Sequence, residues 1–316
     1  MQKALWVFIV VLVQAAIAQD CARIVPVNVF SSETSQPIAF PPERLHASVG
    51  KRPLGISNFE KIKGNRILLL IDISGSMGDK SLREVLDLLL EQGPPDSSLA
   101  YGFFSTKIFL SKGFGNFNEV KKAIQQLPPL EVKGHTALYD ALDQALKLFQ
   151  QPVPGDSILL ITDGGENASK ALEKMVRKEL MENGVRVFAI VPVSLPVFLP
   201  AEGSPSPPPA PSLVMQMTAP ISVLTEKTGG TIYLLMLDDA RWSVKKWRAP
   251  ILQSIQKFWI EGVGGGYRAT VRLPANLTKP GGLRLQLDKK GDNALWDGVV
   301  TYPEYLLPCP SAAPAH

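Results

Sequence analysis

The middle of the chain alternates between apolar runs and amphipathic stretches. The runs 68–71, 157–162 and 185–191 are almost wholly apolar and show no regular alternation. Such runs are typical of strands that are buried on both faces, as in a parallel sheet. The stretches 136–150 and 169–183 repeat apolar residues at helical spacing, so we predict helices there. Together they predict a doubly wound α/β fold with a mostly parallel, Rossmann-like sheet over residues 65–237.

Other segments of this region complete the predicted sheet. Residues 99–105 and 107–110 form an expected antiparallel edge pair, 118–127 a short helix, and 231–236 the last strand. The insertion 195–211 is rich in proline and is expected to form neither helix nor strand. It follows a strand and therefore leaves the sheet at the edge where ligand sites form. A solvated polyproline excursion and a partner platform both remain open interpretations.

Both ends of the chain have the short period of β-structure. Residues 23–30, 44–49 and 53–59 predict strands within an amino-terminal module, 19–64, with a turn at 50–52 and Pro26 at an edge or bulge. In the carboxyl-terminal part, 238–316, Pro250 is expected to break any helix continuous with 241–247. The segments 267–273 and 283–287 alternate strictly, which predicts a hairpin through 276–282. We therefore expect a small β-rich module built from the two terminal segments.

Hydroxyl and carboxylate side chains follow the predicted central strands. Asp72, Ser74 and Ser76 come directly after the first strand, Thr136 opens a helix, and Asp163 follows a later strand. Open α/β sheets bind ligands at these strand ends. All five donors are oxygens, which suits Mg²⁺, Ca²⁺ or Mn²⁺ and disfavours zinc or copper. The same residues could instead only form Asx turns and helix caps, an alternative that the sequence leaves open.

In order, these residues give D-x-S-x-S, then T, then D, which resembles the metal-ion-dependent adhesion site (MIDAS) of the von Willebrand factor type A (VWA) family. The resemblance implies that Ser74 and Ser76 bind the metal directly and Thr136 directly or through water. Asp72 and Asp163 would then act through water and hydrogen bonds. Neutral hydroxyls leave the ion with attraction for one more anion, so the implied partner is a protein that presents Asp or Glu. The terminal segments are similar to a VWA-related group of secreted bacterial, Acidobacteria-type proteins.

Residues 1–18 have the pattern of a cleaved signal peptide: Lys3, an apolar stretch at 5–13, and a small-residue site at 16–18. An uncleaved anchor is the alternative. No other segment is expected to span a membrane, so we predict a secreted or periplasmic protein. The two cysteines, Cys21 and Cys309, lie near opposite ends of the mature chain. In an oxidising compartment they could form a disulfide, although two free thiols remain possible.

Composition is that of a folded protein with a large core, 45% hydrophobic and 20% charged. The formal net charge of +4 is too balanced to indicate a nucleic-acid partner. The three histidines, His46, His135 and His316, lie in unrelated contexts and suggest no catalytic set. We therefore expect a metal-dependent binding module and no enzyme. The alternatives are a hydrolase using the same cation, which would lack a second metal's carboxylates and a placed base, or a structural protein with a silent site.

Overall fold

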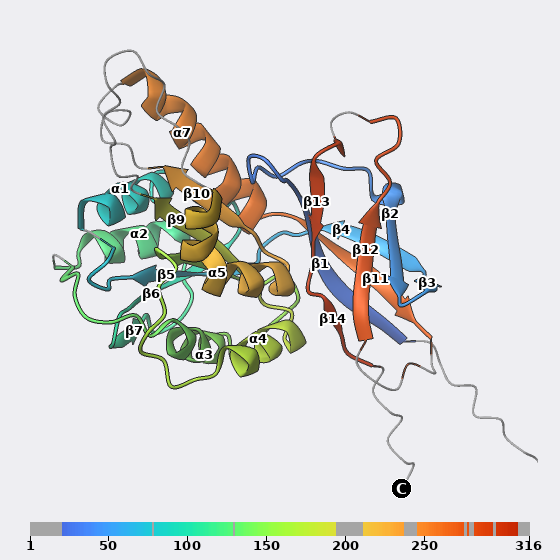
Figure 1. The fold of residues 1–316 in the computed structure, drawn as a ribbon, viewed down its shortest axis with the longest axis horizontal. Coiled ribbons are helices and arrows are strands. Elements are labelled where there is room, and N and C mark those ends of the chain that lie inside the picture. Colours follow the sequence, from blue (N-terminus) through green and yellow to red (C-terminus); the bar gives the residue numbers. More distant parts are fainter. Residues whose placement is uncertain are drawn as a thin grey trace, which may run out of the picture.

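The computed structural model describes residues 21–308 except 78, 129, 194–210, 237–244, 275–276, 278–280 and 293–294. The predicted signal peptide, Cys309 and nearly all of the proline-rich insertion therefore lie outside the described residues. An α/β domain stands beside an antiparallel β-sandwich (Figure 1). Among the described residues, no helix is long and apolar enough to cross a membrane.

The α/β domain is organised around a six-stranded sheet in the order β10-β9-β8-β5-β6-β7. All neighbouring strands are parallel except β6 and β7, which confirms the predicted doubly wound sheet and its antiparallel edge. The chain enters at β5 and then builds outward on both sides, so the order of strands reverses next to β5. The strands are β5 (Arg66–Asp72), β6 (Ser98–Phe104), β7 (Ile108–Leu110), β8 (Ser157–Ile161), β9 (Arg186–Val193) and β10 (Ile232–Met236).

Helices cover both faces of this sheet, and β5 shows why its sequence is apolar throughout. Ile67, Leu69 and Ile71 pack on one side with helices α1 (Asp79–Leu89), α2 (Phe117–Gln125) and α7 (Lys245–Lys257). Leu68 and Leu70 point to the other side, where α3 (Leu138–Leu148), α4 (Glu173–Glu182) and α5 (Pro211–Thr228) pack. Because β5 contacts hydrophobic cores on both faces, its residues show no polar alternation.

The β-sandwich is built from both ends of the chain, as the sequence predicts. One sheet has the order β13-β1-β11-β4 and the other β14-β12-β2-β3. Their facing side chains form a separate hydrophobic core. The first sheet contains β13 (Gly298–Thr301), β1 (Cys21–Ser31), β11 (Tyr267–Leu273) and β4 (Ile56–Lys61); the second contains β14 (Tyr305–Leu306), β12 (Gly281–Leu287), β2 (Leu45–Val49) and β3 (Arg52–Leu54), with a 3-10 turn at Pro42–Arg44.

Two local expectations for the sandwich are confirmed. Strands β2 and β3 form a tight hairpin in which Val49 faces Arg52, and Gly50 adopts the positive φ of 59° that this turn needs. Pro26 pairs with Arg268 of β11, in the half of β1 that has no second partner strand among the described residues. This local edge tolerates the missing N–H of proline.

The predicted hairpin between β11 and β12 is wrong. Strand β11 pairs with β1 and β4, whereas β12 pairs with β2 and β14 in the opposite sheet. The chain therefore crosses between the two layers of the sandwich after Leu273. Both strands alternate because each has one face on the core between the sheets. Alternation shows a buried face but cannot distinguish a strand's neighbour from a strand facing it across the core.

The predicted helix break at Pro250 is also wrong, because α7 runs through it from Lys245 to Lys257. A proline removes one backbone hydrogen bond and crowds the preceding turn. Pro250 is exposed and is the sixth of the thirteen residues of α7, whereas Ile255, Phe258 and Trp259 further along the chain are fully buried. Burial of these large side chains opposes the local cost. The helix then ends in a π-helical turn at Phe258–Val263.

The junction of the two domains contains a buried arginine. Arg186 at the start of β9 is fully buried and donates to Asn28 Oδ1 at 2.9 Å and Ser157 Oγ at 3.0 Å. It also donates to the carbonyl oxygens of Gly155, Val263 and Gly265 at 3.1–3.3 Å. Burial, followed by the charge of Arg268, lowers the Arg186 pKa to about 9, so the side chain stays protonated at neutral pH.

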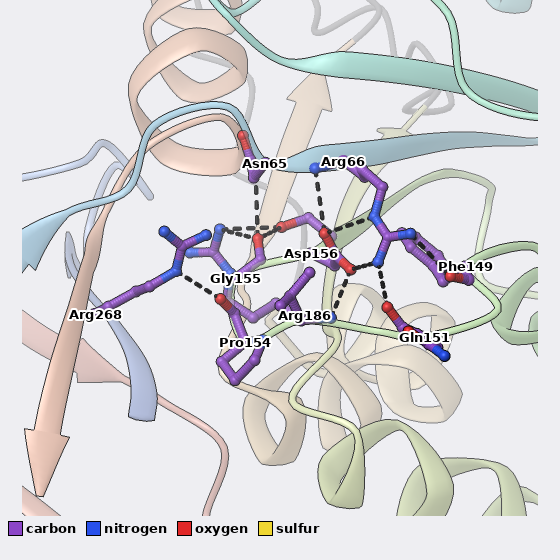
Figure 2. A network of polar contacts seen from close by, with 11 residues as sticks. Asn65, Arg66, Phe149, Gln151, Pro154, Gly155, Asp156, Arg186 and Arg268 are labelled. Carbon is purple, nitrogen blue, oxygen red and sulfur yellow. Dashed lines mark hydrogen bonds and ion pairs between the residues drawn. The ribbon is translucent and has the colours of Figure 1, made fainter. Parts of the chain in front are cut away.

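The loop that leads into β8 is held from both sides at this junction (Figure 2). Arg66 of β5 pairs with the buried Asp156 at 2.5 Å and donates to the Phe149 and Gln151 carbonyl oxygens. Arg268 of β11, in the sandwich, donates to the Pro154 carbonyl oxygen at 2.8 Å. Polar contacts therefore fix the sandwich against the amino-terminal ends of the central strands, opposite the predicted site.

Candidate metal site

Asp72 is fully buried at the carboxyl end of β5. Its Oδ1 accepts the N–H of Ser74 at 2.8 Å, and its Oδ2 accepts the hydroxyl of Thr162 at 2.7 Å. Burial is the main cause that raises the Asp72 pKa to about 6, against the lowering effect of these hydrogen bonds. Among the described residues, no lysine or arginine pairs with this carboxylate. A bound cation would offset the cost of burying its charge.

Ser74 and Ser76 present two hydroxyl oxygens side by side. Their Oγ atoms are 3.2 Å apart, with Ser74 buried and Ser76 exposed. Neighbouring oxygens around an octahedral Mg²⁺, each about 2.1 Å from the ion, are about 3 Å apart. The spacing therefore fits two adjacent ligands of a hard cation.

Thr136 is buried on a second loop that is tied to the first. The Gly75 N–H donates to the Gly134 carbonyl oxygen at 3.1 Å, joining the loop after β5 to the loop before α3. The Thr136 N–H donates to Asn167 Oδ1 at 2.9 Å, and its carbonyl oxygen accepts the N–H groups of Asn167 and Ala168. Thr136 is thereby held between the loop of the serines and the loop after β8.

Asp163 lies half-buried just after β8, and its Oδ1 accepts the N–H of Gly165 at 3.0 Å. A Cβ atom on Gly165 would lie 3.2 Å from Asp163 Oδ1 and 3.6 Å from Thr136 Oγ1. Both oxygens therefore lie close to Gly165, and any larger residue at this position would contact both of them. The Asp72–Thr162 hydrogen bond joins this third loop to the first.

Capping of α3 and α4 does not account for Thr136 and Asp163. The residue before α3 is Ala137 and the residue before α4 is Leu172, and neither helix receives a cap from its N-cap side chain. Asp72 and Asp163 do close short turns through their Oδ1 atoms. Turn formation thus explains one oxygen of each aspartate. The Ser74 hydroxyl contacts both Asp72 and the Ser76 hydroxyl, and the exposed Ser76 hydroxyl contacts Ser74.

Two positioning residues were missed from the sequence. Glu166 accepts the N–H of Leu138 at 2.7 Å, so it caps α3 from another loop, and it also accepts the N–H and hydroxyl of Ser169. Asn167 holds the backbone of Thr136. The signal that could have found Glu166 was the alanine before α3: a helix start without a capping residue needs an acceptor from elsewhere.

The donor set is poor in negative charge. Within the part of the chain that the structure describes, no three His, Cys, Asp or Glu side chains gather as a metal cluster. The proposed donors are two carboxylates and three hydroxyls. This set fits a hard divalent cation, and its hydroxyl ligands leave the positive charge of the ion only partly neutralised. His135, beside Thr136, is exposed and enters the site only through its backbone, which bonds with Thr106.

The model of the family described as VWA domain containing CoxE-like protein matches residues 45–221, more than half of the chain. The chain belongs to this family. VWA domains typically bind a divalent metal at a MIDAS and often mediate metal-dependent protein interactions. No curated protein sequence matches the chain.

Several solved structures are similar to the chain. An aerotolerance-related membrane protein from Bacteroides fragilis NCTC 9343, with multiple mutations to serines, is 21% identical over 61% of this chain and 100% of its own, with a TM-score of 0.41. Proximal thread matrix protein 1 from the mussel byssus, with a zinc-occupied MIDAS motif, is 16% identical over 68% of this chain and 50% of its own, TM-score 0.44. A von Willebrand factor type A protein from Catenulispora acidiphila is 13% identical over 88% of this chain and 74% of its own, with a TM-score of 0.41.

Proposed function

We propose that this protein is a secreted, non-enzymatic binding module that recognises a carboxylate of a protein partner through a divalent cation. The observation that carries the proposal is the hydrogen-bonded meeting of three loops that bring five oxygen side chains to one sheet edge. Ser74, Ser76 and Thr136 would supply hydroxyl ligands, and Asp72 and Asp163 would orient them or bind through water. Mg²⁺ is the expected ion, with Mn²⁺ and Ca²⁺ as substitutes.

The charge of the site favours binding of an anion. Asp72 and Asp163 contribute at most two negative charges, both partly used in hydrogen bonds within the loops. A divalent ion held mainly by neutral hydroxyls keeps its attraction for an Asp or Glu from another molecule. Export and the absence of a catalytic set remain expectations from the sequence and are part of the same proposal.

A metal-dependent capture experiment tests this function. The full chain, immobilised, is offered the extracytoplasmic proteins of its source organism in Mg²⁺ and in EDTA. We expect a partner that is retained in Mg²⁺ and released by EDTA, and that is not retained by Ser74→Ala. Asp143→Ala is the matched control, because Asp143 lies on α3 and pairs only with Lys147 among the described residues. Equal retention in EDTA and Mg²⁺ would refute the proposal.

A further inference from the structure

Two large apolar side chains stand exposed close to the metal site. Leu172 is 70% exposed and Met175 is 59% exposed, among the most exposed large apolar residues of the described chain. They lie within one turn of each other, because the Met175 N–H donates to the Leu172 carbonyl oxygen. Single exposed apolar residues are ordinary, whereas apolar patches rimmed by polar residues mark contact sites. We call Leu172 and Met175 the rim patch.

Hydrogen bonds fix the rim patch relative to the metal site. Asp140 Oδ1 accepts the N–H groups of Lys170 and Ala171, the two residues before Leu172. The Thr136 carbonyl oxygen accepts the Ala168 N–H at 3.1 Å, and Leu172 follows four residues later, a span of at most about 14 Å. The rim patch therefore lies about 10–15 Å from the metal site, a distance that about three to five residues of extended peptide span.

The charges around the rim patch favour an acidic partner. The neighbouring carboxylates are already used: Glu166 caps α3, Asp140 holds the loop, and Glu173 pairs with the arginine one turn later. Lys107 and Lys170 are exposed, and neither forms an ion pair within the described residues. With a cation at the site, the cation and these two lysines offer positive charge to an incoming carboxylate beside an apolar surface.

We propose that the partner segment is an acidic, extended peptide whose carboxylate completes the metal site and whose large apolar side chain, about three to five residues away, packs on Leu172 and Met175. This inference rests on the proposed function and adds to it the second anchor that gives the partner its specificity. Lys170 would contact a further acidic residue between the two anchors.

A random peptide display selection tests the inference while the natural partner is still unidentified. The library is selected on the full chain in Mg²⁺ and eluted with EDTA. We expect enrichment of peptides with one Asp or Glu and a Leu, Ile, Met or Phe about three to five positions away. The double variant Leu172→Asp, Met175→Asp is selected in parallel, and Lys178→Asp on the outer part of α4 serves as the matched control.

The outcomes separate the two proposals. On the double variant the acidic preference should persist, the apolar preference should disappear, and a peptide from the first selection should bind about tenfold or more weakly. An acidic preference without an apolar one, or an apolar preference that survives in the double variant, overturns the inference alone. No Mg²⁺-dependent enrichment on the parent chain overturns the proposed function and the inference together. Unchanged thermal midpoint and Mg²⁺ titration of the double variant verify that its fold and metal site are intact.

Discussion

Buried charged side chains at the two ends of the central strands differ in how they are paired and hydrogen-bonded. At the amino-terminal end, Arg186 donates hydrogen bonds to five acceptors, and Asp156 forms an ion pair with Arg66. At the carboxyl end, Asp72 is equally buried and accepts hydrogen bonds from Ser74 and Thr162, but among the described residues no cation pairs with it. The same strand, β5, begins at the first arrangement and ends at the second.

We infer from this difference that the amino-terminal end of the sheet serves stability and the carboxyl end serves ligand binding. A buried charge that is hydrogen-bonded to several segments holds those segments together, because removing it leaves their polar groups without a partner. A buried carboxylate with no cation paired to it among the described residues leaves its charge uncompensated until a cation binds. We call the amino-terminal end, with Arg186 and Asp156, the sealed end, and the carboxyl end, with Asp72, the open end. Substitutions at the sealed end should therefore lower stability and leave metal affinity intact. Substitutions at the open end should lower metal affinity and leave stability nearly unchanged.

The largest expected effect is a change in stability, and it comes from the predicted disulfide between Cys21 and Cys309. Cys309 lies outside the described residues, but Arg23 donates to the carbonyl oxygen of Pro308 at 2.6 Å, so the two terminal segments lie side by side. A bond closing nearly the whole chain would stabilise the fold by up to about 4–5 kcal/mol on an entropic model. Thiol titration of the denatured, unreduced protein should find no free thiol, and two free thiols would refute the pairing.

Arg186→Met tests the sealed end directly. It removes the guanidinium and leaves acceptors from both domains without a donor, so the free energy of unfolding should fall by about 3–5 kcal/mol. Urea denaturation measures this loss. Below the unfolding transition, Mg²⁺ titration should give the parent affinity. A stable variant with lost Mg²⁺ binding would contradict the assignment of the two ends.

Ser74→Ala and Asp163→Ala test the open end. Ser74→Ala deletes a proposed direct ligand, so it should reduce the affinity for Mg²⁺ more than Asp163→Ala does. Asp163→Ala removes a group that orients the hydroxyls, and such losses weaken metal sites about 10–100-fold. Isothermal titration with Mg²⁺, Mn²⁺ and Ca²⁺ measures both, and thermal midpoints without metal should stay close to the parent value. If Ser74→Ala binds metal as tightly as the parent, the site is misassigned.

Asp140→Ala should have the smallest effect on the metal. Its carboxylate holds the N–H groups of Lys170 and Ala171 and takes no part in the proposed ligand set. We expect less than a twofold change in Mg²⁺ affinity, with a loss of stability of about 1 kcal/mol from the broken hydrogen bonds. A tenfold loss of Mg²⁺ affinity in calorimetry would instead place Asp140 in the metal site.

The sequence by itself determined the α/β domain because burial on two faces leaves a clear pattern. Strand β5 contacts both hydrophobic cores, so its apolar run could not be confused with an exposed strand. The same reasoning predicted that Asp72 and Asp163 lie at one edge of the sheet, because both follow parallel strands, whereas Thr136 was predicted from its place at the start of a helix. The terminal β-segments were predicted for a similar reason, from their period of two.

Only the tertiary structure decided which segments meet and what overrides a local preference. Alternation in β11 and β12 could not show that they lie in opposite sheets, since each needs only one face on the shared core. The break expected at Pro250 depends on a local cost, which the burial of Phe258 and Trp259 opposes. Glu166 caps α3 across 28 positions of sequence, and Arg186 collects acceptors from both domains. Such contacts depend on distance in space, which no local pattern of residues records.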